Sequence, residues 1–140
     1  MEQRPQAKTE LADIFEEVLI KKSSMIMKNE KPIGEFYKID KKNVLGTGSF
    51  GTVQRVLHKK TGVIRACKTI DKRKISNPQR FADEIKILTD LDHPNVIKMY
   101  EYFEDDKRVY LITELCKGGE LFDMICSKDY MQEDEAAQIF

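Results

Sequence analysis

The chain has 140 residues, which is enough for one folded domain with a hydrophobic core of its own. Its 24 basic and 24 acidic residues give a formal net charge of zero, which argues against nucleic acid or an anionic membrane as a partner. No apolar run could span a membrane or serve as a signal peptide, and the three cysteines lack C-x-x-C spacing, so we predict a cytoplasmic protein without a zinc site or redox centre.

The first 35 residues are predicted to form a helix followed by a linker. Between Thr9 and Lys22, apolar residues recur at helical spacing, acidic residues lie early and lysines close the segment, as the helix dipole favours. Two roles are open for this helix, docking a partner or packing on the rest of the protein. Residues 22–35 are polar and contain Pro32 and Gly34, which indicates a linker. We therefore divide the chain into residues 1–35 and a compact domain at residues 36–140.

The compact domain is predicted to begin with three antiparallel strands between Tyr37 and Ile70. Glycines after Leu45 interrupt the strand-like pattern, and a tight turn at Lys59–Gly62 interrupts it again. A helix follows, because Asn77 is a favoured N-cap and Pro78 suits the first helical position.

The pattern then returns to strands and ends in helices. Strand-like runs at residues 96–103 and 109–114 flank a polar turn, which predicts a hairpin. Residues 120–127 are predicted to form a short helix, and residues 133–140 open another.

The glycine-rich segment at residues 45–53 contains the spacing G-x-G-x-x-G-x-V. Glycines let a backbone approach phosphate oxygens without Cβ clashes, although dinucleotide-binding folds share this spacing. A dinucleotide site needs a helix directly after the glycines, and here a strand, a tight turn and another strand leave no room for one. This segment alone allows two interpretations. It is either a phosphate-binding loop that connects two strands, or a hairpin that binds no ligand.

Lys68 supplies independent support for an anion-binding site. Strict alternation in the third strand places Lys68 on the same face as Ala66 and Ile70, which is the apolar face. A lone buried charge costs several kcal/mol, so we expect an anion beside this lysine.

Glu84 is the candidate partner of Lys68 within the chain. At about 100° per residue, Glu84 falls inside the apolar stripe that Phe81, Ile85 and Leu88 form on the predicted helix. Lys68 is therefore expected to bridge Glu84 and the phosphates of a nucleotide. A purely structural ion pair is the alternative.

Taken together, these motifs resemble the small lobe of eukaryotic protein kinases. The resemblance covers residues 36–140 and rests on segments that occur in the family's order and spacing: Gly46–Val53, Arg65-Ala66-Cys67-Lys68, Glu84, His93-Pro94-Asn95 and Gly118-Gly119-Glu120. The family usually has V-A-I-K on the third strand, and the departures Arg65 and Cys67 lie on the face opposite Lys68.

The resemblance implies a fold class and a set of nucleotide contacts. The fold would be α+β, a kinase-like small lobe with a five-stranded antiparallel sheet, a regulatory helix, a hinge and the first helices of a truncated large lobe. Leu45 and Val53 would sandwich adenine against Ala66, the backbone of Glu114 and Cys116 would bind its edge, and Thr113 would be the gatekeeper. Lys68 and Glu84 would be the catalytic residues, and the cofactor contacts would be Leu45, Gly46, Thr47, Gly48, Ser49, Phe50, Gly51, Val53, Ala66, Lys68, Thr113, Glu114, Cys116 and Glu120.

Three residues have two interpretations each. Glu120 would contact the nucleotide ribose or a basic residue of a peptide substrate, and its alternative is an exposed acid favoured by a helix N-terminus. Met99 and Leu88 would belong to the family's hydrophobic spine, or are simply core.

The resemblance also implies ATP as cofactor, with Mg²⁺, and a protein substrate. The sequence segments at residues 91–97, 102–105 and 118–123 are similar to those of calcium- and calmodulin-regulated Ser/Thr kinases, especially the calcium-dependent kinases of plants and protists. A calcium sensor domain or calmodulin is therefore an implied partner. No D-x-[DN]-x-[DN]-G loop occurs in the sequence, so that sensor is expected beyond Phe140 or on another protein.

Neither H-R-D-x-x-x-x-N nor D-F-G occurs in the sequence. We therefore expect the metal ligands beyond Phe140 and negligible phosphoryl transfer by these residues alone. The leading hypothesis is the ATP-binding portion of a protein serine/threonine kinase. The alternatives are a non-catalytic truncated or pseudokinase module that binds nucleotide or a partner, and a small-molecule kinase of related fold.

Overall fold

The computed structural model describes residues 27–48, 51–128 and 130–140, and the structural statements below concern these residues. The helix predicted at residues 9–22 lies outside them. In the described part of the chain, no helix is both long enough and apolar enough to cross a membrane.

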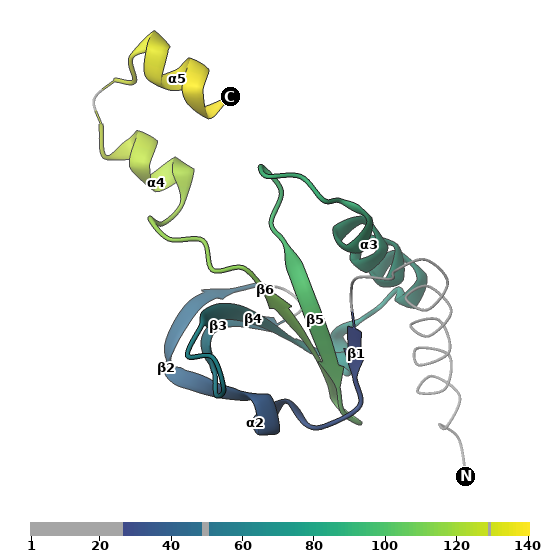
Figure 1. Ribbon diagram of the computed structural model, residues 1–140. Helices are drawn as coiled ribbons and strands as arrows, with labels where there is room; N and C mark the ends of the chain where they lie inside the picture. The colour runs from purple at the N-terminus through teal and green to yellow at the C-terminus, as the bar shows by residue number, and fades with distance from the viewer. Residues whose placement is uncertain (1–26, 49–50, 129) are drawn as a thin grey trace.

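Five strands of the sheet pair in antiparallel fashion, as predicted. In chain order they are β2 (Tyr37–Thr47), β3 (Gly51–His58), β4 (Ile64–Asp71), β5 (Met99–Glu104) and β6 (Arg108–Thr113). Their order across the sheet is β5-β6-β4-β3-β2, so the β5–β6 hairpin lies beside β4 (Figure 1).

A sixth strand was not predicted. β1 (Met27–Asn29) pairs in parallel with β5, with Met27 opposite Glu101 and Asn29 opposite Phe103. A one-turn helix, α2 (Ile33–Phe36), then leads into β2. The segment predicted as a linker therefore contains a strand and a helical turn. Three residues are too few to show a period of two, and their partner strand lies far away in the sequence, so local pattern gave no sign of β1.

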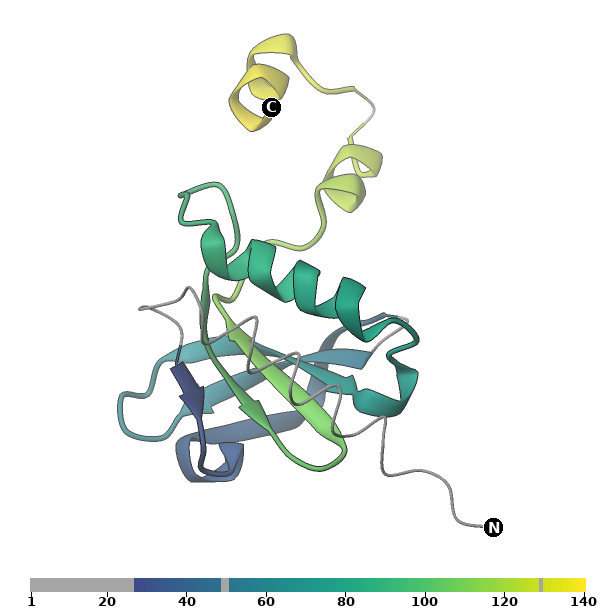
Figure 2. The ribbon, with the colours of Figure 1, turned by 90° about the vertical axis from the view of Figure 1, so that its right-hand side faces the viewer.

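One long helix covers the sheet. α3 (Pro78–Asp90) lies across one face, and the short turn α2 lies on the other side of the sheet (Figure 2). The side chain of Asn77 caps α3 by accepting a hydrogen bond of 3.0 Å from the Arg80 amide, as predicted. A 3-10 turn, η1 (Lys72–Lys74), links β4 to α3.

The C-terminal helices extend away from the sheet. α4 (Leu121–Cys126) and α5 (Glu133–Ile139) follow β6 and lie beyond the end of the sheet in both views (Figures 1 and 2). Neither has a buried residue, and Phe122 and Phe140 are 70% and 89% exposed. These two helices therefore add little to the core.

The sheet has a hydrophobic cluster on each face. The cluster under α3 includes Ile70, Phe81, Ile85 and Met99, so Met99 is core as expected. The opposite cluster consists of Tyr37, Val56, Cys67, Phe103, Tyr110 and Ile112, with Ile33 and Phe36 packed against it. Because Cys67 and Ile70 belong to opposite clusters, β4 is anchored on both faces, which fixes the direction of the side chains between them.

Candidate functional site

The glycine segment forms the turn between β2 and β3. Gly46 lies opposite Val53, and Thr47 lies opposite Thr52. The Gly48 amide donates a hydrogen bond of 2.8 Å to the Gly51 carbonyl, which closes the loop. Ser49 and Phe50 lie outside the described residues. The predicted strand–loop–strand arrangement is therefore present.

The three glycines of this loop differ in what they are needed for. A Cβ on Gly51 would lie 1.7 Å from the Thr69 carbonyl oxygen of β4, so close strand packing requires glycine there. At Gly46 a Cβ would have no heavy atom within 4 Å, and at Gly48 it would meet only the Gly51 carbonyl at 4.0 Å. Open space beside Gly46 and Gly48 leaves their backbone accessible to a ligand, so protein packing does not explain these two glycines.

Lys68 lies on the face of β4 that α3 covers, between the buried residues Ala66 and Ile70. Its neighbours across the sheet are Val53 on β3 and Leu111 on β6. The side chain of Lys68 is exposed, and within the described chain its ammonium has no ion pair. The expected strand face is therefore correct, but the face is open at this point and not filled by core.

Glu84 is also exposed, and its ion-pair partner in the structure is Arg80. The Arg80 Nε and Glu84 Oε1 atoms lie 3.7 Å apart, one helical turn from each other. No pair between Lys68 and Glu84 exists among the described residues, so that pairing stays a prediction.

The exposure of Glu84 has a simple geometric cause. The buried residues of α3 are Phe81, Ala82 and Ile85. Ala82 lies about 100° around the helix from Phe81, on the side away from Glu84. Including Ala82 therefore moves the centre of the buried stripe away from Glu84, compared with a stripe drawn through the large apolar residues alone. Glu84 therefore lies at the edge of the stripe, and the expectation that it points into the core was wrong.

Two of the predicted adenine-binding residues, Val53 and Ala66, lie on the same face as Lys68. Ala66 is 5% exposed and lies opposite Arg55 on β3 and Thr113 on β6. Leu45 is 49% exposed, and Val53 is partly buried. Val53, Ala66 and Lys68 thus share one face, because Val53 is the cross-strand partner of Lys68.

The segment after β6 is held by Lys98. The Glu114 amide donates to the Lys98 carbonyl at 2.9 Å, and the Lys98 amide donates to Glu114 Oε1 at 2.9 Å. Thr113 Oγ1 donates to the Glu114 carbonyl at 3.2 Å, and Cys116 is exposed. Sequence reasoning missed Lys98, because a side chain-to-backbone bond between residues far apart leaves no local pattern.

Glu120 precedes α4 and is exposed. Its side chain makes no capping hydrogen bond to the helix. Gly118 and Gly119 lead into it with φ of 108° and 79°, conformations that favour glycine. A contact of Glu120 with nucleotide or substrate stays a prediction.

These residues fit a nucleotide. The open glycines and the exposed lysine could contact phosphates. The apolar face around the lysine could hold a base, and the backbone groups after β6 could bind the edge of that base. In the described residues, no group of three or more His, Cys, Asp or Glu side chains could hold a metal ion.

Comparisons with known proteins agree with this geometry. Residues 39–140 match the protein kinase domain family. The chain is 42% identical over 129 residues to calcium-dependent protein kinase 5 of Plasmodium berghei, covering 92% of this chain and 23% of that protein. It is 45% identical over 100 residues to calcium-dependent protein kinase 12 of Arabidopsis thaliana, covering 69% and 20%.

A solved structure shares the fold. The crystal structure of Rad53 residues 1–466 in complex with AMP-PNP superposes with a TM-score of 0.72 and 28% identity, covering 77% of this chain and 29% of that chain. The chain thus spans less than a third of each of these relatives. On the family match and the shared fold, the chain belongs to the protein kinase domain family.

Proposed function

We propose that this chain is the ATP-binding portion of a protein serine/threonine kinase that is calcium-regulated in the full-length protein. The observation that carries the proposal is the exposed Lys68 on the apolar face of β4, opposite Val53, which follows the glycine loop on β3. The comparisons support it, because several relatives are named calcium-dependent protein kinases and the matching Rad53 structure was solved with AMP-PNP.

In this proposal each part of the site has a separate task. The amides near Gly46 and Gly48 approach the phosphates, and the Lys68 ammonium neutralises their charge. Leu45, Val53 and Ala66 hold the base, and the backbone of Glu114 and Cys116 binds its edge. ATP supplies the γ-phosphoryl group for transfer to a protein hydroxyl. We expect Mg²⁺ to accompany it, with protein ligands from the H-R-D and D-F-G segments that this sequence does not contain.

Glu84 has a conditional role. In the structure it pairs with Arg80, and both side chains are more than half exposed. An exposed pair of this kind contributes little stability, so it costs little to separate. We propose that Glu84 exchanges Arg80 for Lys68 in the nucleotide-bound kinase and thereby orients the lysine toward the phosphates. A cytoplasmic location, consistent with free Cys67, Cys116 and Cys126, completes the proposal.

The test is a phosphoryl-transfer assay on the full-length natural protein that contains these residues. Wild type should transfer labelled γ-phosphate to a serine peptide, faster with calcium than with a chelator. Lys68→Met should lower kcat/KM by about 100-fold or more, because it removes a charge that the transition state needs. Lys74→Met, at another exposed lysine outside the site, should change it by less than about twofold.

Other outcomes favour the alternatives. Binding of ATP without transfer to any acceptor would support the non-catalytic module. Transfer to a small metabolite but not to a peptide would support a small-molecule kinase. Full activity of Lys68→Met would contradict the role given to Lys68.

A further inference from the structure

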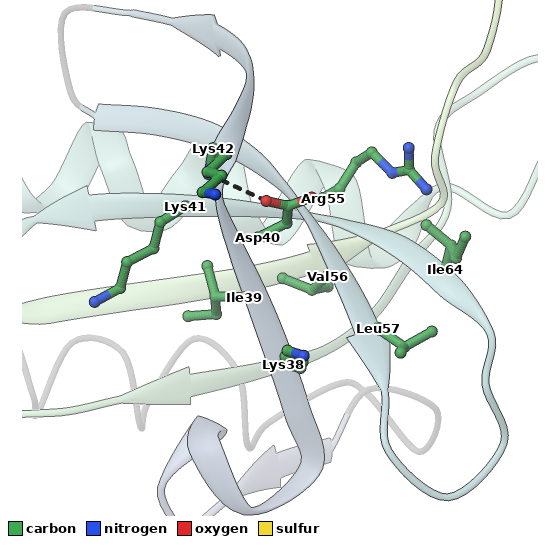
Figure 3. Close-up of a pocket in the computed structure, with 9 residues that line it drawn as sticks. All are labelled: Lys38, Ile39, Asp40, Lys41, Lys42, Arg55, Val56, Leu57 and Ile64. Atoms are coloured by element: carbon green, nitrogen blue, oxygen red, sulfur yellow. Dashed lines mark hydrogen bonds between the residues drawn. The ribbon is translucent and has the colours of Figure 1, made fainter.

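A groove with a volume of about 600 Å³ lies between the first half of β2 and strands β3 and β4 (Figure 3). Four apolar residues line it, Ile39, Val56, Leu57 and Ile64, and Leu57 and Ile64 give its floor most of the exposed apolar surface. Leu57 and Ile64 are 39% and 41% exposed, although they are large aliphatic residues in strands. A concave surface with exposed aliphatic side chains favours an apolar ligand surface over bulk water.

A bulge in β2 builds one wall of this groove. Ile39 lies opposite Val56 and Val44 lies opposite Gln54, so residues 40–43 of β2 face a single residue of β3. The bulge is held by its own turn, in which Asp40 accepts hydrogen bonds from the Lys42 amide at 3.1 Å and Asn43 Nδ2 at 2.6 Å. The wall therefore has a defined shape before any ligand arrives.

The rim of the groove is basic. Lys38, Lys41 and Lys42 are exposed, and Arg55 extends from β3. Figure 3 shows Lys41 and Arg55 extending to opposite sides of the groove. Across the described chain, no ion pair involves any of them.

This charge is a local concentration in a chain whose total charge is balanced. Residues 37–60 contain six basic residues and one acidic residue, while the whole chain has 24 of each. That one acidic residue is Asp40, whose two oxygens are occupied by the bulge turn. Asp40 keeps its negative charge, so the groove presents four basic side chains and one acidic side chain around an apolar floor, and a complementary partner carries the opposite pattern.

We propose that this groove docks an acidic amphipathic helix of a partner protein. Apolar residues at i, i+3, i+4 and i+7 of such a helix would lie on Leu57 and Ile64, and its flanking carboxylates would face Lys41, Lys42 and Arg55. A helix is about 10 Å wide and fills a concave groove, whereas a bilayer surface is flat and contacts only the rim. A small free anion would bind the basic rim but would gain nothing from contact with the apolar floor.

The lining of the groove includes none of Gly46, Gly48 and Lys68, but Arg55 lies opposite Ala66, so the groove adjoins the proposed adenine surface. The site would recruit an acidic regulator or substrate to the small lobe. Loss of the proposed phosphoryl transfer would leave this docking unchanged, so the two proposals fail separately.

The test uses the 140-residue chain and a fluorescein-labelled synthetic peptide of sequence EELLEELLEELLEE. Binding is followed by fluorescence anisotropy, with a QQLLQQLLQQLLQQ peptide as the uncharged control. We expect saturable binding of the acidic peptide that weakens as salt rises, because exposed charges are screened. Lys41→Glu/Lys42→Glu should weaken binding by about tenfold or more, since two attractive contacts become repulsive.

A double variant of equal charge change controls for the loss of net positive charge. Lys60→Glu/Lys74→Glu alters two exposed lysines outside the groove and should weaken binding by less than about threefold. Leu57→Ser should weaken binding without changing its salt dependence, and circular dichroism confirms that each variant is folded.

Three results would overturn the proposal. One is absence of saturable peptide binding by folded wild type. Another is equal weakening by the two double variants, which would show general charge attraction. The third is that the chain binds phosphatidylserine vesicles but not the peptide, and that Lys41→Glu/Lys42→Glu abolishes the vesicle binding.

Discussion

The guanidinium of Arg65 donates a hydrogen bond of 2.9 Å to the hydroxyl of Tyr37, joining β4 to the first residue of β2. Tyr37 in turn donates to the Glu101 carboxylate on β5, and Arg65 lies 3.8 Å from the same carboxylate. The Arg65 guanidinium also lies 4.0 Å above the Tyr100 ring. A partly buried network thus ties three strands together on the face opposite Lys68.

Replacing Arg65 should destabilise the fold. Arg65→Val removes a charged hydrogen bond and a cation–π contact and leaves the Glu101 carboxylate without its cation, so we expect a loss of about 1–3 kcal/mol in the free energy of unfolding. Urea unfolding measures it. In a Tyr37→Phe background the same substitution should cost less, because one partner is already absent. Strict additivity of the two changes would contradict a coupled network.

Gly51 and Gly46 should respond differently to alanine. Gly51→Ala places a Cβ where the Thr69 carbonyl stands and forces β3 and β4 apart, so it should lower stability by about 1–3 kcal/mol or more. Gly46→Ala meets no neighbouring atom and should leave thermal unfolding nearly unchanged while weakening nucleotide binding. Similar melting temperatures for the two variants would contradict this division of roles.

The three thiols should react at different rates. Cys67 is 1% exposed, and burial raises the pKa of its thiol to about 11, with a small opposing effect of Thr69. Cys116 and Cys126 are exposed. A thiol-reactive dye should therefore modify two cysteines in the native chain and the third only after unfolding. Rapid modification of Cys67 in folded protein would show that β4 is less well packed than described.

Acid should destabilise the β5–β6 hairpin through Asp105. Partial burial opposes ionisation of this carboxyl, but hydrogen bonds from the Lys107 amide, the Tyr110 hydroxyl and the Arg108 amide lower its pKa. Since the folded pKa lies below the unfolded value of about 3.9, the stabilisation is present above about pH 4 and is lost as pH falls below it.

Unfolding at neutral and acid pH measures this dependence. Asp105→Asn should reduce the loss of stability between about pH 6 and pH 3, because the substituted side chain does not titrate. Asp106→Asn, at the exposed neighbour, is the control and should keep the wild-type profile. Identical pH profiles for wild type and Asp105→Asn would contradict the role of this carboxyl.

The parts of the fold that sequence predicted are those with strong local signals. Asn77 and Pro78 mark the start of α3, and alternation marks β4. β1 was missed because its three residues are defined only by pairing with distant β5. Local periodicity cannot report a pairing of that kind.

The candidate site divides in the same way. Alternation placed Lys68 on the correct strand face, but alternation alone does not show whether that face is filled. The large apolar residues of α3 misplaced Glu84, because the small side chain of Ala82 also belongs to the buried stripe. Sequence therefore predicted which side chains share a face better than which of them are buried or paired.

The central claim is that Lys68 binds the phosphates of ATP. Comparing the binding of a fluorescent ATP analogue by wild type and by Lys68→Met tests this claim most directly. We predict saturable binding by wild type, weakened by about tenfold or more in Lys68→Met and by less than about twofold in Lys74→Met, because Lys68, unlike Lys74, lies on the strand face that we propose binds the nucleotide. Equal affinity of wild type and Lys68→Met would contradict the claim that Lys68 binds the phosphates.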